Sequence, residues 1–217
     1  MDIQVIYEDD DVLVVEKPCG VATQTKKFGQ ADMESLLKNY RAAKGEPPYI
    51  GIVHRLDQPV RGVMVFAKTR EAAADLSRQV AKRLTDKHYY AMTDGVPSRK
   101  KGTLEDFLVR DGRTNTSTVA TEKSAEAKSA RLSYEVIEQN GKNAILKISL
   151  ETGRHHQIRV QLAHAGYPIV GDKKYNFKEN ITPTQGGLRL CSYKIGFRHP
   201  VTRKKLEFEI DKPFYLS

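Results

Sequence analysis

Cysteine is scarce in this chain of 217 residues, which has only Cys19 and Cys191, far apart in the sequence. There is no CxxC pair, so the sequence supports neither a zinc knuckle nor a disulfide framework. We expect both thiols to be small buried side chains in a reducing cytoplasm.

Long apolar runs are also absent. No stretch approaches the roughly 18 apolar residues of a membrane span, and the acidic start MDIQVIYEDDD lacks the pattern of a signal peptide. The acidic turn at residues 8–11 lacks the alternate spacing and the glycine of a calcium loop. Around His155 and His156 there is no further histidine or carboxylate at the spacing of metal ligands. We therefore expect a cytoplasmic protein without a metal ion.

Positive charge is what the chain has in surplus. Its 36 lysines and arginines against 27 acidic residues give a formal net charge of +9. Such a surplus favours a polyanionic partner, most often nucleic acid, and the alternative is a merely basic soluble protein. With 39% hydrophobic residues the composition is that of an ordinary globular protein. We expect one domain over residues 1–217, and a monomer.

The apolar pattern predicts more strands than helices. Helices are expected at residues 32–43 and 155–164. A third helix is expected to begin after an N-cap at Thr69, and its inner face would be formed by Ala73, Leu76, Val80 and Leu84. Strands are expected at residues 5–7, 12–15, 63–67, 87–93, 132–136, 144–150, 188–197 and 205–210. Asn140-Gly141 predicts a hairpin turn, and the polar residues 98–130 are read as a hairpin with a mobile linker and a basic contact surface. The pattern predicts an α+β fold around a mixed, mostly antiparallel sheet flanked by helices and loops.

The stretch Gly51–Lys68, GIVHRLDQPVRGVMVFAK, joins a charged loop to a buried strand. In the loop, Asp57 follows His54 and Arg55, and an opposite charge within a few ångströms lowers the pKa of an aspartate by about 1–3 units. An ionised, rigidly held carboxylate can act as a nucleophile or a general base. The alternative is that Asp57 only forms a structural salt bridge with Arg55.

A second polar cluster, GRHHQIR, occupies residues 153–159 at the predicted start of a helix. Arginine, histidine and glutamine at a helix N-terminus suit an anion. The anion could be a phosphate or the Asp57 carboxylate, and the alternative is a basic surface patch without a catalytic role.

These two blocks resemble the signatures of the RluA family of RNA pseudouridine synthases. His54-Arg55-Leu56-Asp57 with Gly62 resembles the HRLD signature, and residues 153–159 resemble the GRxHQIR block. Further matches, in the family's order, are VVEKPCG at 14–20, KHYYA at 87–91, GYPIVGD at 166–172 with Tyr175, and His199-Pro200 with Thr202. Two positions depart from the family pattern: Arg61 stands where a serine is frequent, and Gln161 where a histidine is frequent. The resemblance covers nearly the whole chain and implies a short family member, without an appended RNA-binding domain.

The resemblance implies a pseudouridine-synthase catalytic core that isomerises uridine in ribosomal RNA or tRNA. It assigns Asp57 as the catalytic carboxylate, Tyr89 as the ring that stacks on a flipped-out uracil, and Arg159 as the partner of the carboxylate. Arg55 would fill the vacated gap or hold a phosphate, while His54, Arg154, His156 and Gln157 would support RNA binding.

The implied reaction changes no oxidation state and cuts no phosphodiester bond, so it requires no cofactor. Asp57 could add to C1′ of the sugar, add to C6 of the base, or remove a sugar proton so that a glycal forms. Two other functions remain open at this stage. One is an RNA-binding protein that keeps the fold without catalysis. The other is a carbohydrate or nucleoside hydrolase built on Asp57, although glycosidases typically use two acids.

Overall fold

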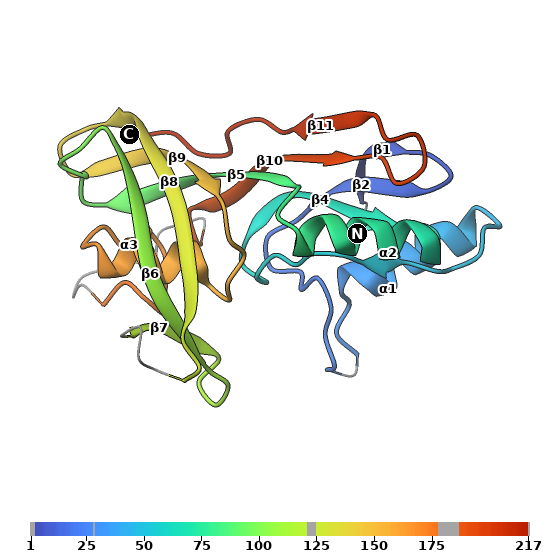
Figure 1. Ribbon diagram of the computed structural model, residues 1–217, viewed down its shortest axis with the longest axis horizontal. Helices are drawn as coiled ribbons and strands as arrows, with labels where there is room; N and C mark the ends of the chain where they lie inside the picture. The colour runs from blue at the N-terminus through green and yellow to red at the C-terminus, as the bar shows by residue number, and fades with distance from the viewer. Residues whose placement is uncertain (1–2, 28, 121–124, 178–186, 217) are drawn as a thin grey trace. The chain divides into compact units, whose positions relative to one another are not determined.

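A computed structural model describes residues 3–27, 29–120, 125–177 and 187–216. The chain folds as two compact units, Met1–Lys87 with Ser192–Asp211 and His88–Cys191 with Lys212–Ser217. Both units contain strands and helices, as Figure 1 shows, which confirms the α+β class. The expectation of a single domain over residues 1–217 stays a prediction.

The first unit is built on antiparallel strands with two helices. Its strands are β1 (Gln4–Glu8), β2 (Val12–Lys17), β3 (Gly51–Ile52), β4 (Arg61–Ala67), β11 (Lys205–Glu209) and most of β10 (Leu190–Arg198). They are ordered β1-β2-β4-β10, with β3 beside β4 and β11 beside β10. Its helices are α1 (Met33–Ala43) and α2 (Arg70–Ala81).

The core of the first unit lies between the central strands and α2. β2 and β4 are buried almost throughout, which is typical of strands covered on both faces. One alternating set from these strands, with Val14 and Val65, packs against Leu76 of α2 and Phe197 of β10. Burial of these aliphatic side chains, about 1.5–3 kcal/mol each, supplies much of the stability of this unit.

The predicted start of α2 is confirmed, and its predicted inner face is partly wrong. Thr69 caps the helix by accepting from the backbone N–H of Ala72 at 3.1 Å. Leu84, expected on the buried face, is 60% exposed. The helix has already ended at Ala81, and Arg83 adopts a left-handed φ of 57°. Leu84 therefore no longer follows the helical repeat that the sequence pattern implied.

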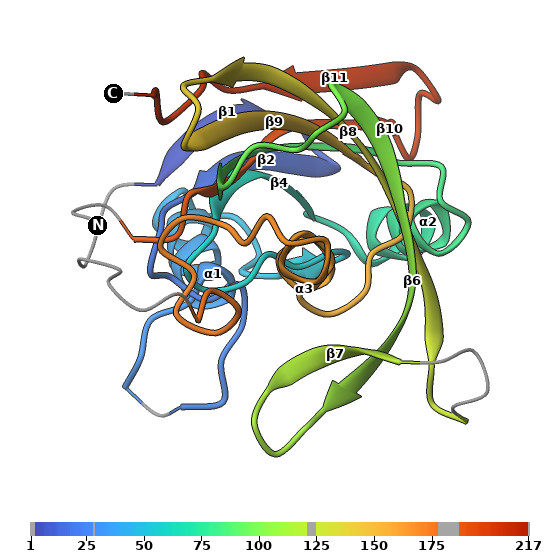
Figure 2. The same ribbon diagram turned by 90° about the vertical axis from the view of Figure 1, so that its left-hand side faces the viewer.

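The described part of the second unit contains five antiparallel strands and one helix. Its strands are most of β5 (Asp86–Asp94), β6 (Lys101–Asp111), β7 (Thr116–Ala120), β8 (Lys128–Gln139) and β9 (Asn143–Leu150), ordered β5-β9-β8-β6-β7. The hairpin predicted at Asn140-Gly141 joins β8 to β9. Helix α3 (Gln157–His164) packs against β6 and β7, and Figure 2 shows these strands curving around it.

Residues 98–130 are more regular than the sequence suggested. β6 is an eleven-residue strand that pairs with β8 over residues 101–108 and forms a hairpin with β7 over residues 107–111. Polar residues alternate with partly buried ones in β6, because one face of the strand is exposed. Residues 121–124, part of the expected mobile linker, lie outside the described residues.

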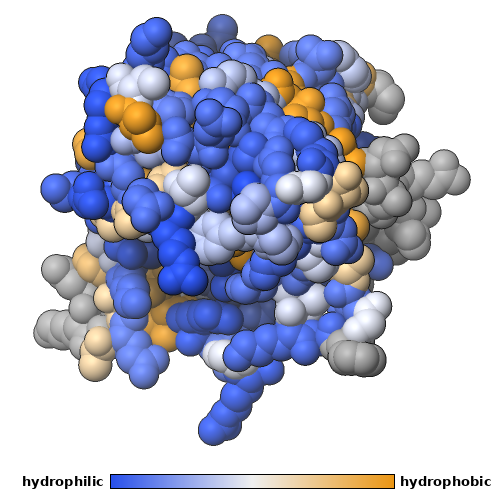
Figure 3. Space-filling view, turned by 90° about the vertical axis from the view of Figure 1, so that its right-hand side faces the viewer, coloured by the Kyte–Doolittle hydropathy of each residue, from blue (hydrophilic) through white to orange (hydrophobic). Residues whose placement is uncertain are grey.

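One face of the described chain is mostly polar (Figure 3). Figure 3 shows one face on which hydrophilic side chains predominate and apolar ones are scattered. Among the residues described, no helix is both long enough and apolar enough to cross a bilayer.

At Gly62, strand β4 lies very close to the backbone of Ser192 in β10. Its φ is +154°, and a Cβ placed there would lie 2.4 Å from the carbonyl oxygen and 2.7 Å from the nitrogen of Ser192. Both neighbours are backbone atoms, so the contact cannot be relieved by a rotamer change. We expect Gly62→Ala to lower the free energy of unfolding by about 1–3 kcal/mol in urea titrations. Gly112→Ala, where a Cβ would meet nothing within 4 Å, is the control. Equal stability of the two variants would contradict this account.

Candidate active site

Asp57 lies on the loop between β3 and β4, and its side chain is half-buried. The peptide groups on both sides of it are held. The buried hydroxyl of Thr23 donates to the carbonyl of Leu56 at 3.0 Å and accepts from the Leu56 N–H at 3.2 Å. On the other side, the carbonyl of Asp57 accepts from the N–H of Val60 at 3.0 Å, and the next carbonyl, that of Gln58, accepts from the N–H of Gly20 at 2.9 Å. The backbone carrying Asp57 is therefore fixed to a second loop, as an aimed carboxylate requires.

Lys17, at the end of β2, joins these two loops from inside. Its side chain is fully buried. The ammonium donates to three backbone carbonyls, those of Pro18, Val21 and Gln58, at 2.9, 2.6 and 3.1 Å. Burial lowers the pKa of Lys17 to about 8, although the nearby groups of Cys19 and Asp57 partly offset that effect. In the sequence, Lys17 stands in the VVEKPCG match, and its only sign of this role is that it ends a largely apolar run.

His54 serves the loop as a hydrogen-bond acceptor. Its Nε2 accepts from the backbone N–H of Val65 in β4 at 3.1 Å, so the ring proton resides on Nδ1. Burial, and secondarily the charge of Lys87, lower the pKa of His54 to about 3. The imidazole is therefore neutral at physiological pH and ties the start of the loop to the strand.

Arg55 is exposed. Among the residues that the structure describes, it forms no ion pair with Asp57, so the alternative of a structural Arg55–Asp57 salt bridge is not observed. An exposed guanidinium next to a fixed loop remains available to a ligand.

In the second unit, Arg159 of α3 forms a bidentate pair with Asp172. The Nε and Nη2 atoms each lie 2.8 Å from a carboxylate oxygen, and both side chains are buried. Asp172 also accepts from the backbone N–H of Lys174 at 2.9 Å, and the guanidinium lies over the ring of Tyr175 at 5.2 Å. Paired, planar contacts of this kind fix the orientation of the arginine. In the sequence, Asp172 ends the GYPIVGD match, which does not indicate its pairing with Arg159.

His156 is buried and adopts a left-handed φ of 52° just before α3. Its Nδ1 lies 2.7 Å from the hydroxyl of Tyr175, which itself accepts from the backbone N–H of Ser117 at 2.8 Å. Through Tyr175, these contacts link the start of α3 to β7. The expected contact of His156 with RNA stays a prediction.

Gln157 and Arg154 both support the start of α3. The buried Gln157 carboxamide accepts from the hydroxyl of Thr152 at 2.8 Å and from the Arg154 N–H at 3.0 Å, and donates to the carbonyl of Arg131 at 3.1 Å. Arg154 Nε donates to the carbonyl of Ser129 at 2.8 Å. These contacts give both residues a structural role, and their contact with RNA stays a prediction.

Tyr89 lies in β5 opposite Ile148 of β9, and its side chain is buried. Tyr90 is buried too, and Lys147 lies over its ring at 5.9 Å. Neighbouring residues of a strand point to opposite faces, so only one of these rings faces any given side of the sheet.

The predicted residues thus fall into two groups. The first unit contains His54, Arg55 and Asp57, and the second contains Tyr89, Arg154, His156, Gln157 and Arg159. That Asp57, Tyr89 and Arg159 act on one nucleotide stays a prediction.

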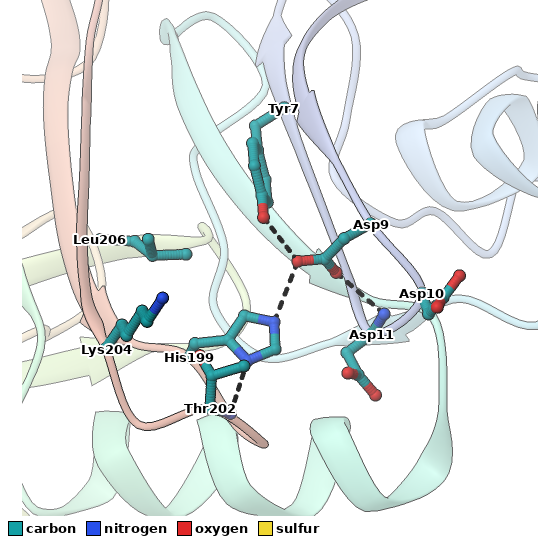
Figure 4. A pocket seen from close by; sticks show the side chains of 8 residues that line it. All are labelled: Tyr7, Asp9, Asp10, Asp11, His199, Thr202, Lys204 and Leu206. Atoms are coloured by element: carbon teal, nitrogen blue, oxygen red, sulfur yellow. Dashed lines mark hydrogen bonds and ion pairs between the residues drawn. The ribbon is translucent and has the colours of Figure 1, made fainter.

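Asp9, Asp11 and His199 form a cluster of possible metal ligands beside a pocket of about 300 Å³ (Figure 4). The Asp9 carboxylate already accepts from Tyr7, from His199 and from two backbone N–H groups of its own turn. His199 uses Nε2 for Asp9 and Nδ1 to accept the N–H groups that follow it, those of Val201 and Thr202. A metal at this position would break these contacts. The cluster is better explained as a set of hydrogen bonds that joins the β1–β2 turn to the β10–β11 turn.

Lys17→Met should reveal the contribution of the buried ammonium. The change leaves three carbonyls without their donor, and we expect a loss of about 1–3 kcal/mol in the free energy of unfolding. The folded pKa near 8 lies below the ordinary value of 10.5. Below pH 8 the lysine is charged in both states, and the cost of burying its charge lowers the stability in full. Between pH 8 and pH 10.5 the unfolded chain keeps this proton while the folded chain releases it, so stability rises with pH. Urea titrations should therefore show wild-type stability rising across that window relative to Lys17→Met. Parallel pH profiles would refute the assignment, and Lys142→Met is the exposed control.

His54 should not titrate between pH 5 and pH 8. We expect its ring resonances, assigned by comparison with His54→Gln, to stay constant in two-dimensional NMR spectra over that range. Because the folded pKa is about 3 against an ordinary 6.5, the contribution of His54 to stability is full above pH 6.5 and is lost as the pH falls toward 3. A shift change with a midpoint near 6.5 would show that the ring is not held as an acceptor.

Proteins similar to this chain in sequence are named RNA pseudouridine synthases. The sequence profile described as RNA pseudouridylate synthase matches residues 11–164. An uncharacterized RNA pseudouridine synthase of Aquifex aeolicus is 35% identical, over 97% of this chain and 70% of its own length. Ribosomal large subunit pseudouridine synthase D of Vibrio cholerae is 34% identical, over 98% of this chain and 69% of its own.

Solved structures agree on the fold. Human RNA Pseudouridylate Synthase Domain Containing 4 superimposes with a TM-score of 0.83 at 22% identity, covering 97% of this chain and 88% of that one. Human RNA Pseudouridylate Synthase Domain Containing 1 gives the same score and identity, covering 99% and 85%. The fold is therefore that of a pseudouridine synthase domain. By its profile match and its relatives, this chain belongs to the RluA family of RNA pseudouridine synthases, which are isomerases.

Proposed function

We propose that this protein converts uridine to pseudouridine in a structured RNA, and that Asp57 is the group that acts on the nucleotide. The observation that carries the proposal is the double fixation of the Asp57 loop, by Thr23 on one side and by Lys17 and Gly20 on the other. A carboxylate that only needed to be solvated would not require a backbone fixed at both flanking peptides.

The isomerisation breaks the N1–C1′ bond of uridine and forms a C5–C1′ bond. The proton on C5 leaves and a proton is added to N1, so atoms and charge balance without a redox partner. Asp57 can serve this exchange by adding to C1′, by adding to C6, or by removing a sugar proton to give a glycal. Each route needs an ionised carboxylate with a fixed direction.

The target base must leave its stack before Asp57 can reach the sugar–base junction, which costs a few kcal/mol. In this proposal the Tyr89 ring stacks on the flipped uracil, a contact of about 1–3 kcal/mol. Arg159, oriented by Asp172, pairs with the Asp57 carboxylate. The exposed Arg55 fills the gap in the RNA or holds a phosphate.

The proposed substrate is large-subunit ribosomal RNA, with tRNA as the second candidate. A relative that covers nearly the whole chain is named for the ribosomal large subunit, and the net charge of +9 suits any folded RNA. We further propose that the enzyme works in the cytoplasm as a monomer.

Asp57→Asn keeps the size and polarity of the side chain and removes its charge. We expect no detectable tritium release from RNA labelled at C5 of uridine, while RNA affinity changes less than about threefold. Asp10→Asn, in the exposed acidic turn, is the matched control and should keep full activity. Appreciable turnover by Asp57→Asn would remove Asp57 as the catalytic group.

The same assay separates the alternatives. Release of free uracil would indicate a hydrolase, whereas binding without tritium release from any cellular RNA would indicate a non-catalytic RNA-binding protein. Mapping pseudouridines in ribosomal RNA and tRNA from cells with and without this gene would identify the modified position.

A further inference from the structure

We propose that the C-terminal end of α2 and the β10–β11 turn together form a second RNA-contact surface, called here the α2 basic surface. It would hold the phosphodiester backbone of the substrate through residues that take no part in the chemistry. The choice of RNA as the polyanion rests on the proposed function.

The α2 basic surface is formed by residues 75–84 and 198–204. These two segments contain six arginines and lysines and a single carboxylate, that of Asp75. All six cationic side chains are exposed: Arg78, Lys82, Arg83, Arg198, Arg203 and Lys204. More than half of the net charge of the chain is thus gathered in two short segments.

The two segments are joined by specific contacts. The Gln79 carboxamide donates to the carbonyl of Arg198 at 2.7 Å and accepts from the N–H of the same residue at 2.9 Å. Asp75 pairs with Arg78 at 3.2 Å and with Arg203 at 2.7 Å. A buried amide and a buried carboxylate therefore hold the end of α2 against the turn, and the cations are presented together from a fixed backbone.

One carboxylate cannot neutralise this surface. Asp75 is shared by two guanidinium groups, and within the described part of the chain Lys82, Arg83 and Lys204 have no ion pair. Other lysines of the same unit are paired, Lys68 with Glu8 and Glu46, and Lys205 with Asp86 and Glu207. Like charges held close together destabilise the folded state, and an anionic ligand would offset that repulsion.

The α2 basic surface has a defined border. Lys204 lines the pocket of Figure 4 together with Asp9, Asp10 and Asp11 of the β1–β2 turn. Lys204 stands at this border, and the acidic turn beyond it would repel a polyanion, so the RNA backbone should pass Lys82, Arg83 and Lys204 on the α2 side. Exposed arginines and lysines of this kind bind phosphates without reading sequence.

The test compares wild type with the triple variant Lys82→Gln, Arg83→Gln, Lys204→Gln. None of these residues belongs to the proposed catalytic site. The probe is an in vitro transcript of large-subunit ribosomal RNA, and affinity is measured by filter binding over a range of KCl concentrations. If each side chain contacts one phosphate, the slope of log K against log[KCl] should fall by about 3 in magnitude. In the tritium-release assay, KM should rise at least tenfold while kcat at saturating RNA stays unchanged.

The control removes the same charge elsewhere, through Arg70→Gln, Lys128→Gln and Lys142→Gln, which are all exposed. An equal loss of affinity in this control would show a net-charge effect and overturn the proposal, as would an unchanged slope in the first variant. If the triple variant lost binding to polyglutamate but kept its affinity for RNA, the surface would be a site for an acidic protein, and the proposal would also be overturned. Unfolding in urea should show the first variant to be at least as stable as wild type, because like charges have been removed.

The two proposals fail separately. If the wild-type enzyme forms pseudouridine and the triple variant has the same KM and the same salt slope, only the proposal of the α2 basic surface is refuted. A wild-type protein that forms no pseudouridine in any RNA would refute the proposed function, whatever the binding data show.

Discussion

A buried ammonium group, that of Lys17, holds together the loops on which the catalytic proposal depends. Its three hydrogen bonds go to backbone carbonyls of two separate segments, the turn after β2 and the loop that carries Asp57. Burying a charge is costly unless it is fully hydrogen-bonded, and here the carbonyl oxygens supply that solvation. Because the carbonyls must converge on one nitrogen, the lysine also determines where the two loops lie relative to each other.

The second unit uses the same device with the charges reversed. Asp172 is a fully buried carboxylate that receives a bidentate arginine and backbone N–H groups. It orients Arg159 on α3, while the contacts of His156 with Tyr175 and of Gln157 with Thr152 fix the start of that helix. In both units a buried ion orients the polar group that the proposed chemistry uses. Much of the polar sequence signature is thus explained by positioning.

Charged residues have different tasks in different parts of the first unit. Burial would raise the pKa of Glu8, but hydrogen bonds from Lys68, Lys44 and Tyr40 outweigh that effect and hold it at about 2. That network joins the end of β1 to α1 and to Lys68 and stabilises the fold. At the end of α2, by contrast, the cations exceed their partners, and such an excess suits a ligand better than it suits stability.

The sequence by itself determined the fold class, nearly all the elements and the family. Alternating and continuous apolar runs depend on local geometry, so β2, β4 and the β8–β9 hairpin could be predicted from residue order alone. Asp57 and Arg159 stood out because charged side chains beside buried runs are rare and were arranged in a known signature. Only the tertiary structure decided the partners: Lys17 under the Asp57 loop, Asp172 against Arg159, and Gln79 across to Arg198. Those contacts join residues from 13 to 119 positions apart, and the geometry that brings such atoms within hydrogen-bonding distance is a property of the whole fold, which no local pattern encodes.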